Sequence, residues 1–343
     1  MGTYGINNSN SKYFALTGRI IRKNGKIVLG YTNSSLELMV QGTGISVEFE
    51  TGDNEPVNQP GLRIYVDDIP VKEIVLTERY GKYELAAFED GLHKVKIVKI
   101  TEAAMSYAAV CMLYVDGSLY PAEKDTSRKK AQFIGDSITC GFGVLGEPEQ
   151  EYSLRLEDGE KSYAKFLSDK CNFEAEWVSV SGYGMFVEYT GDTLNVLPNV
   201  YPYTNYFCDK EEREDYTRFV PEYIFINLGT NDSGHLKDSP LMNGSLMIEG
   251  FKSAYENFLY TLRMAYEKAV IICIVGTLAD GVYEYVSEVV ESVREKGFDN
   301  LYAIELPFHD VERDGIACGH PTEATHRKDA DRIYDFMRGE GLI

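Results

Sequence analysis

The first third of the chain alternates between apolar and polar residues in short runs. Because successive side chains of a β-strand point to opposite faces, this period of two predicts half-buried strands. Turn residues separate the runs: Asn24-Gly25 suits a type I′ hairpin, and further reversals are expected at residues 42–44, 51–53 and 89–91. The predicted strands span residues 26–31, 36–40, 45–49, 62–66, 83–87, 93–100 and 108–115. This spacing predicts an all-β sandwich domain of jelly-roll type over residues 1–120.

From residue 131 the pattern changes to apolar strands that alternate with amphipathic helices. The predicted strands are residues 131–134, 177–180, 222–228, 270–275 and 301–306, and the predicted helices are residues 161–170, 248–268, 283–296 and 322–338. Such alternation predicts a three-layer α/β domain over residues 131–343, with a parallel sheet and with ligands at the carboxyl ends of its strands. The polar and charged residues 121–130 are interpreted as the linker.

Composition narrows the class of protein. A net charge of -20 over 343 residues disfavours nucleic acid as a partner, since phosphate backbones are bound by clustered Lys and Arg. No run approaches the ~20 apolar residues that span a bilayer, so no membrane partner is expected. Six scattered cysteines without a Cys-x-x-Cys pair, and an N-terminus without a basic and apolar leader, predict reduced thiols in a cytoplasmic protein.

Groups suited to ester hydrolysis follow the predicted strands. Ser137 comes after the strand that ends at residue 134, Gly182 follows the next strand, and Asn231 follows the third. His320 stands just before the last helix. Hydrolysis through a serine needs a nucleophile, a base that takes its proton and donors for the oxyanion, and these four residues supply all three.

In the motifs Gly135-Asp136-Ser137, Ser181-Gly182, Gly229-Thr230-Asn231-Asp232 and His320-Pro321, the sequence resembles the SGNH (GDSL-type) hydrolases. With the β-rich segment before them it resembles carbohydrate esterase family 2, which removes acetyl groups from sugars. The resemblance implies Ser137 as nucleophile, His320 as base, and an oxyanion hole made by Ser137, Gly182 and Asn231. It also implies acetylated mono- or oligosaccharides as substrates, such as fragments of xylan or mannan, and neither a metal nor a cofactor.

Two positions depart from the family pattern. Many SGNH hydrolases carry an aspartate three residues before the histidine, where this chain has Ala317. The departure predicts a Ser137–His320 dyad oriented by a backbone carbonyl, with Asp314 as the alternative partner if its loop folds back. The second departure is Gly319, where family members often place an aromatic wall for the substrate pocket.

Other aromatic and histidine positions are interpreted one by one. Tyr183 and Tyr189 belong to a tyrosine-rich stretch, residues 183–207, which suits either a packed loop or a rim that stacks on a sugar. His309 is interpreted as structural, His326 is expected to be solvated on the last helix, and Trp177 is expected in the core.

Two rival functions stay open at this level. The same catalytic groups serve a short-chain lipase or thioesterase, although no apolar lid is evident in the sequence. A carbohydrate-binding protein with decayed catalysis is the rival from another class, and intact Ser137, Asn231 and His320 argue against it. The oligomeric state is left open.

Overall fold

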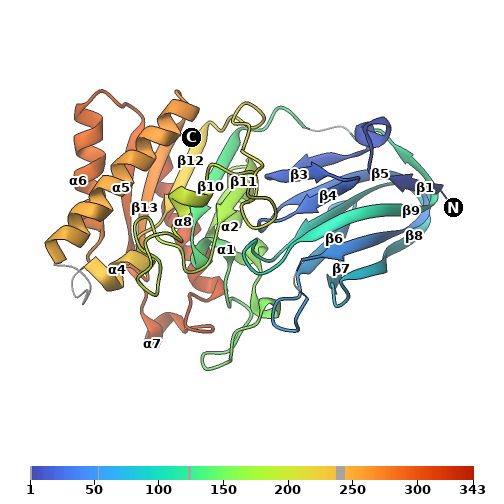
Figure 1. The fold of residues 1–343 in the computed structure, drawn as a ribbon, viewed down its shortest axis with the longest axis horizontal. Helices are drawn as coiled ribbons and strands as arrows, with labels where there is room; N and C mark the ends of the chain where they lie inside the picture. The colour runs from blue at the N-terminus through green and yellow to red at the C-terminus, as the bar shows by residue number, and fades with distance from the viewer. Residues whose placement is uncertain (1, 53, 123–124, 237–243) are drawn as a thin grey trace.

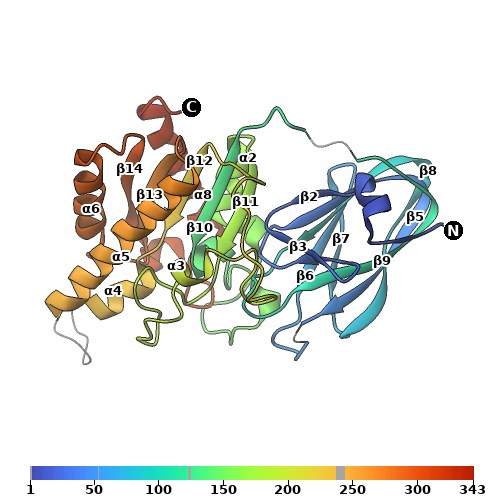
Figure 2. The same ribbon diagram turned by 45° about the horizontal axis from the view of Figure 1, so that its top comes forward.

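The computed structural model describes residues 2–52, 54–122, 125–236 and 244–343 and contains two separate sheets. The N-terminal sheet lies beside the β11 edge of the C-terminal sheet in both views (Figures 1 and 2). The predicted fold class is confirmed: an all-β domain precedes an α/β domain with a parallel sheet. The predicted reversal at 51–53 and the predicted linker include residues 53, 123 and 124, which lie outside the described residues.

The N-terminal sheet is antiparallel, in the order β3-β4-β9-β5-β8-β6-β7, with β1 paired to β9 and β2 to β5. Asn24 and Gly25 both have positive φ, at 53° and 71°, between the paired strands β3 and β4, so the type I′ prediction is confirmed. The strands are β1 (Gly2–Gly5), β2 (Ala15–Thr17), β3 (Ile20–Lys23), β4 (Lys26–Leu29), β5 (Ser35–Thr51), β6 (Gly61–Val66), β7 (Ile69–Val75), β8 (Tyr80–Lys99) and β9 (Ala108–Tyr120).

Two of the predicted reversals are wrong. Residues 42–44 lie inside β5 and residues 89–91 lie inside β8, so each pair of predicted strands is one long strand. The pairing register shifts between Gly42 and Gly44, which marks a bulge rather than a turn. Across this bulge the buried residues change from even numbers, such as Val40, to odd numbers, such as Ile45. Both halves of β5 therefore face the same core.

The C-terminal sheet is parallel, in the order β11-β10-β12-β13-β14. Its strands are β10 (Lys130–Gly135), β11 (Glu174–Ser179), β12 (Tyr223–Asn227), β13 (Val270–Thr277) and β14 (Leu301–Phe308). The helices are α1 (Ser137–Cys140), α2 (Tyr163–Lys170), α3 (Leu197–Val200), α4 (Thr230–Leu236), α5 (Gly244–Ala265), α6 (Tyr283–Glu295), α7 (Val311–Asp314) and α8 (Glu323–Gly339). Short 3-10 helices occur at Asn8–Tyr13, Leu154–Leu156 and Gly159–Lys161. These bounds match the predicted strand and helix pattern closely.

Helices cover both faces of the parallel sheet, so neighbouring residues of one strand enter different cores. Phe133 of β10 packs in the core under α2 and α8, where Phe225 and Trp177 both stack against its ring. Ile134 belongs to the other core, which contains the apolar sides of α5 and α6. Trp177 is 4% exposed, as expected for a core residue. The helices cover the faces of the sheet, so loops meet at the carboxyl ends of its strands.

The interface between the two domains is packed and polar. Tyr31 and Ala103, which come from the N-terminal domain, belong to the apolar core under α5 and α6. Arg19, also from that domain, is fully buried, with its Nε 3.5 Å from a carboxyl oxygen of Glu176 in β11. A second charged contact joins Arg63 of β6 to Asp158. The β-domain is thus joined to the α/β domain by buried groups as well as by the chain connection.

Candidate active site

The nucleophile candidate, Ser137, is placed by a sharp turn between β10 and α1. Asp136 caps the helix by accepting a hydrogen bond from the Ile138 N–H at 3.0 Å. Gly135 is required here because a Cβ at this position would lie 2.0 Å from Thr139 Oγ1. The turn leaves Ser137 at the first position of the helix, where its own N–H has no intrahelical partner. Ser137 is 6% exposed, at the carboxyl end of the sheet.

The structure brings His320 to Ser137. The distance from His320 Nε2 to Ser137 Oγ is 2.9 Å, and His320 Nδ1 lies 3.2 Å from the Cys318 carbonyl oxygen. With Nδ1–H donating a hydrogen bond to that carbonyl, Nε2 is the acceptor that faces the serine hydroxyl. Burial lowers the pKa of His320, while the hydrogen bond to Cys318 opposes part of this effect. The imidazole is therefore neutral and able to accept a proton near neutral pH.

A tight turn holds this imidazole in place. Ala317 and His320 exchange both backbone hydrogen bonds, each 2.9 Å long. Cys318 and Gly319 between them have φ of 49° and 73°, as in a type I′ turn. The Cys318 N–H also donates to the Glu147 carbonyl at 3.1 Å. Cys318, whose carbonyl accepts the hydrogen bond from the imidazole, is thereby fixed by the turn and by a neighbouring loop.

Asp314, the alternative partner of the histidine, is engaged elsewhere. Its carboxylate binds Arg313 and Lys328, each at 2.6 Å. Hydrogen bonds from these two cations hold its pKa well below the usual range. The loop does not fold back to place this carboxylate on the imidazole. The hydrogen-bond partner of His320 Nδ1 is the Cys318 carbonyl instead.

The three oxyanion candidates are Ser137 itself, Gly182 in the loop after β11, and Asn231 at the start of α4. Within the described residues, the Ser137 and Gly182 N–H groups have no hydrogen-bond acceptor. Gly182 has a φ of 80°, which its lack of a Cβ permits. Asn231 lies in the first turn of α4, and its Nδ2 donates to the Tyr183 carbonyl at 3.0 Å. Its other contact, to Asp136 Oδ2, is 3.4 Å long, so this second amide hydrogen is only weakly held.

Buried carboxyl groups brace these loops. Asp232 accepts hydrogen bonds from the backbone N–H groups of Met185, Phe186 and Val187 at 2.8 to 3.0 Å. This ties the loop after Gly182 to the start of α4. Burial raises the pKa of Asp136 to about 7, because its carboxyl group is completely enclosed. Both aspartates serve the shape of the site and are not placed to attack a substrate.

An aromatic pair beside His320 was missed at the sequence level. Phe142 and Tyr152 stack with their ring centroids 3.6 Å apart, and the Phe142 ring lies 4.4 Å from the imidazole. A Cβ on Gly319 would meet no described atom within 4 Å, so that side of the turn is open. The Phe142–Tyr152 pair therefore supplies an aromatic surface next to His320, from a segment other than the one that contains Gly319. The available signal was the aromatic residue directly after Gly141, in the loop behind Ser137.

The tyrosine-rich stretch divides into exposed and buried rings. Tyr189 is 67% exposed, and its ring covers the position where a Cβ on Gly182 would lie, at 2.8 Å. Tyr183 is half-buried and packs edge-on against Phe207. Tyr201, in contrast, is fully buried and packs in the core. Tyr183 and Tyr189 thus lie at the site, while part of the stretch is a packed loop.

Two other histidines are in different environments. The expectation for His326 is wrong: it is fully buried, and its Nδ1 accepts the Tyr163 N–H at 3.2 Å. The helix face that carries it packs on α2, which the spacing of His326 did not reveal. His309 is buried, with Nε2 2.6 Å from the Gly315 carbonyl, in agreement with a structural role. In the part of the chain that the structure describes, no group of three or more His, Cys, Asp or Glu residues has metal-binding geometry.

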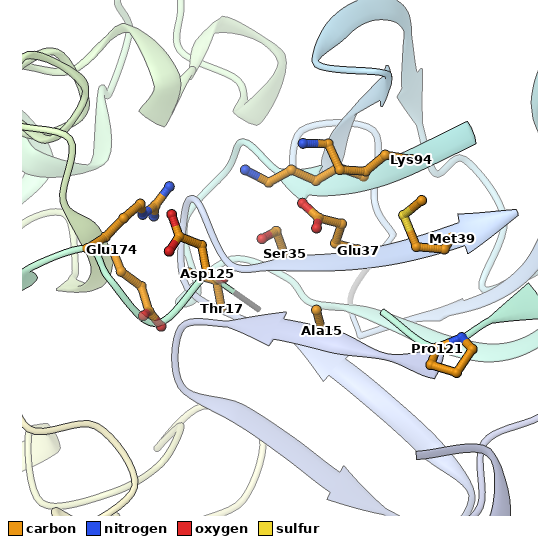
Figure 3. Close-up of a pocket in the computed structure, with 11 residues that line it drawn as sticks. Ala15, Thr17, Ser35, Glu37, Met39, Lys94, Pro121, Asp125 and Glu174 are labelled. Atoms are coloured by element: carbon orange, nitrogen blue, oxygen red, sulfur yellow. The ribbon is translucent and has the colours of Figure 1, made fainter. Parts of the chain in front are cut away.

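A polar groove lies away from these residues (Figure 3). Its volume is about 450 Å³, and its lining includes Glu37 and Lys94 of the N-terminal sheet, Asp125, and Glu174. Because Glu174 is the first residue of β11, whereas Gly182 follows the end of that strand, the groove lies toward the amino end of the parallel sheet. The groove is therefore separate from the candidate active site.

Comparisons with known proteins agree with this arrangement. Residues 16–122 match the family model described as carbohydrate esterase 2 N-terminal, and residues 132–333 match GDSL-like lipase/acylhydrolase. The chain is 30% identical over 312 residues to cellulase/esterase CelE of Acetivibrio thermocellus, a match that covers 88% of this chain and 36% of CelE. The chain thus spans about a third of that relative.

Two further relatives are similar over most of their length. An acetylxylan esterase/glucomannan deacetylase of Cellvibrio japonicus is 22% identical, over 93% of this chain and 86% of the relative. The structure of a family two carbohydrate esterase from Clostridium thermocellum, solved in complex with cellohexaose, superposes with a TM-score of 0.85 at 28% identity, covering 95% of this chain and 98% of the other. In the described part of the chain, no helix has the length and apolar character needed to cross a membrane.

Proposed function

The chain belongs to the family 2 carbohydrate esterases, with a GDSL-like hydrolase domain, and from this membership we propose that it removes O-acetyl groups from sugars through a Ser137–His320 dyad. Proteins of this kind are carboxylic ester hydrolases. The observation that carries the proposal is the 2.9 Å distance between Ser137 Oγ and His320 Nε2, at the end of the sheet where the loops of Gly182 and Asn231 also meet.

In the proposed reaction, Ser137 Oγ attacks the acetyl carbonyl carbon while its proton passes to His320 Nε2. The carbonyl oxygen becomes an oxyanion, which the Ser137 and Gly182 N–H groups and the Asn231 amide stabilise. When the tetrahedral intermediate collapses, the bond to the sugar oxygen breaks and this oxygen takes the proton from His320. A water molecule then attacks the acetyl-serine by the same route, which releases acetate and restores Ser137.

The proposed substrates are acetylated mono- or oligosaccharides of the xylan or mannan type. The acetylxylan esterase and glucomannan deacetylase names of a relative support this class. The exposed Tyr189 ring beside Gly182 supports a sugar-facing surface, since aromatic rings cover the apolar face of a pyranose. We also propose that the enzyme acts in the cytoplasm on short, soluble fragments, a location that its six free cysteines favour.

A comparison of acyl esters and sugars tests the proposal. Hydrolysis of p-nitrophenyl acetate is measured against the butyrate and octanoate esters, together with acetate release from acetylated xylo- and manno-oligosaccharides. We expect a preference for acetate of at least about fivefold over octanoate, since overfilling a packed site costs about 1 to 3 kcal/mol. Ser137→Ala is the control and is expected to abolish hydrolysis with an unchanged circular dichroism spectrum.

The other outcomes separate the rivals. Preference for octanoate, without acetate release from any sugar, would favour a lipase or thioesterase. Sugar binding without hydrolysis of any ester would favour a carbohydrate-binding protein. Activity retained by a folded Ser137→Ala variant would remove this serine from the reaction.

A further inference from the structure

A segment of the N-terminal domain reaches into the catalytic site. It connects β8 to β9 and begins directly after Lys99. The Ile100 carbonyl accepts hydrogen bonds from the Gly159 N–H at 2.8 Å and from Thr32 Oγ1 at 3.1 Å. Glu102, two residues later, is completely buried. The segment is therefore fixed against the chain between α1 and α2, and it carries a carboxyl group into the interior.

This carboxyl group contacts the oxyanion loop. Glu102 Oε2 accepts a hydrogen bond from the Ser181 N–H at 2.9 Å. Ser181 directly precedes Gly182, whose N–H is an oxyanion donor in the proposed reaction. The adjacent peptide units are held by other bonds: the Val180 N–H donates to the Gly135 carbonyl at 3.1 Å, and the Gly182 carbonyl accepts from the Tyr189 N–H at 3.0 Å. The N–H of Ser181 itself is held by Glu102.

A buried lysine lies beside the main chain of this segment. Lys99 is fully buried, and its Nζ donates to the carbonyl oxygens of Thr101 and Glu102, each at 2.6 Å. Burial raises the pKa of the Glu102 carboxyl group, and the charge of Lys99 opposes part of this effect. Glu102 Oε2 can accept the Ser181 N–H in either protonation state, since a protonated carboxyl group keeps an acceptor oxygen.

A second buried carboxyl group extends the same cluster to the histidine. Glu157 is 1% exposed and accepts a hydrogen bond from the Tyr152 hydroxyl at 2.8 Å. Tyr152 stacks on Phe142, which packs against His320. Burial and the nearby Glu102 carboxylate raise the pKa of Glu157, so Glu157 holds its proton more tightly than an exposed glutamate. The cluster therefore supports the base as well as the oxyanion loop.

We propose that Glu102 of the N-terminal domain is a positioning residue of the esterase, because it fixes the Ser181–Gly182 segment in the orientation that aims the Gly182 N–H at the oxyanion. This role rests on the proposed function of Ser137 and Gly182. Through Glu102 the β-domain contributes to transition-state stabilisation, in addition to packing against the α/β domain. An N–H that is not held in advance must be reoriented during the reaction, at a cost that appears in kcat.

Three substitutions test this role. Glu102→Ala removes the acceptor, whereas Glu102→Gln keeps an oxygen acceptor on a side chain of the same length. Glu176→Gln is the matched control, because Glu176 is also completely buried and also binds the N-terminal domain, through Arg19, while its polar partners among the described residues lie outside residues 181–184. The measurements are kcat and KM for p-nitrophenyl acetate, the rate at which diethyl p-nitrophenyl phosphate modifies Ser137, and the melting temperature.

We expect Glu102→Ala to lower kcat and the rate of modification by about tenfold to a hundredfold with little change in KM, less than the loss caused by removing an oxyanion donor outright. Glu102→Gln is expected to restore most of kcat, and Glu176→Gln to lower the melting temperature but not kcat. If Glu102→Ala does not fold, Glu102→Asp replaces it, since its shorter side chain cannot reach the Ser181 N–H and the same loss of kcat is expected.

Two results would overturn the proposal: an unchanged kcat in a folded Glu102→Ala or Glu102→Asp variant, or an equal loss of kcat in Glu176→Gln. A wild-type protein that hydrolyses no ester would contradict the proposed function instead. The two failures are therefore distinguishable.

Discussion

The His320 imidazole is held by a main-chain carbonyl, at a place where many related hydrolases use a carboxylate. The Cys318 carbonyl can fix the tautomer and the ring orientation, because it accepts a hydrogen bond from Nδ1–H, with Nδ1 3.2 Å from the oxygen. As a neutral dipole it stabilises the imidazolium less than a charged partner does. In the proposed dyad, the strength of His320 as a base therefore depends on burial and on the geometry of one turn.

The first prediction separates the dyad from a triad that includes Asp314. His320→Ala is expected to lower kcat by about a thousandfold or more, since the serine loses its base. Asp314→Asn is expected to leave kcat within about threefold, because the Asp314 carboxylate binds Arg313 and Lys328 and the Cys318 carbonyl, not Asp314, is the partner of His320 Nδ1. Steady-state kinetics with p-nitrophenyl acetate measures both. An equal loss in the two variants would mean that a triad operates.

The second prediction concerns pH. Burial lowers the pKa of His320, so the imidazole stays neutral at pH values where an exposed histidine begins to protonate. Activity is present above this pKa and is lost as the pH falls through it, which places the acid limb of kcat/KM below about pH 6.5. Asp136→Asn is the control, because the pKa of Asp136 is raised to about 7 and its titration would otherwise overlap. An acid limb that moves in this variant would assign it to Asp136.

At the scale of elements, the turn from Ala317 to His320 takes the place of an acidic partner in the proposed dyad. Its two central residues have positive φ, and the second is a glycine. Substituting Gly319→Val is expected to cost about 1 to 2 kcal/mol of backbone strain, since a Cβ there meets no described neighbour but disfavours this conformation. Displacement of the Cys318 carbonyl is expected to lower kcat by about tenfold or more, because the imidazole loses its alignment.

Gly297 provides a matched control for this turn. It has a φ of 93°, a Cβ there would also meet no described atom within 4 Å, and it lies after α6, away from the site. Gly297→Val is expected to lose similar stability, measured by urea unfolding, while kcat is unchanged. If the two variants lose activity to the same extent, the turn has no special role in orienting His320.

At the scale of the whole molecule, buried charges bind the β-domain to the catalytic domain. Arg19 lies between Glu176 and Glu214 and stacks over Tyr201, with its guanidinium carbon 4.4 Å from the ring centroid. Arg19→Met is expected to reduce the free energy of unfolding by about 3 kcal/mol, because it leaves buried carboxylates without their partner. Lys23→Met is the control: Lys23 pairs with Asp209 across the same two domains, but its side chain is half-exposed, and little change is expected.

Chemical denaturation followed by tryptophan fluorescence measures this effect, since Trp177 lies in β11 beside Glu176, the residue that binds Arg19. Similar losses of stability in the two variants would mean that the buried pair is no stronger than a surface pair.

Local patterns were sufficient to determine most of the elements. Period-two and helical spacings are properties of neighbouring residues, so the five strands of the parallel sheet and the helices α2, α5, α6 and α8 were predicted near their observed bounds. In the N-terminal sheet this holds for β4, β6 and β9, whereas the short strands β1, β2 and β3 and the strand β7 were not predicted. The sequence failed where glycines bend a strand without ending it, as at Gly42, because a bulge and a turn use the same residues. It also failed at His326, whose burial depends on a helix packed from elsewhere in the chain.

The chemical groups of the site were evident in the sequence by themselves, because Ser137, Gly182, Asn231 and His320 each follow a recognisable strand or precede a helix. Only the tertiary structure decided what surrounds them. The Cys318 carbonyl, the Phe142–Tyr152 pair and Glu102 come from separate segments of the chain. Sequence spacing carries no record of such contacts, since they arise when loops from two domains converge at one end of a sheet. Residue types thus indicate the proposed reaction, while packing between domains sets the orientation of each group.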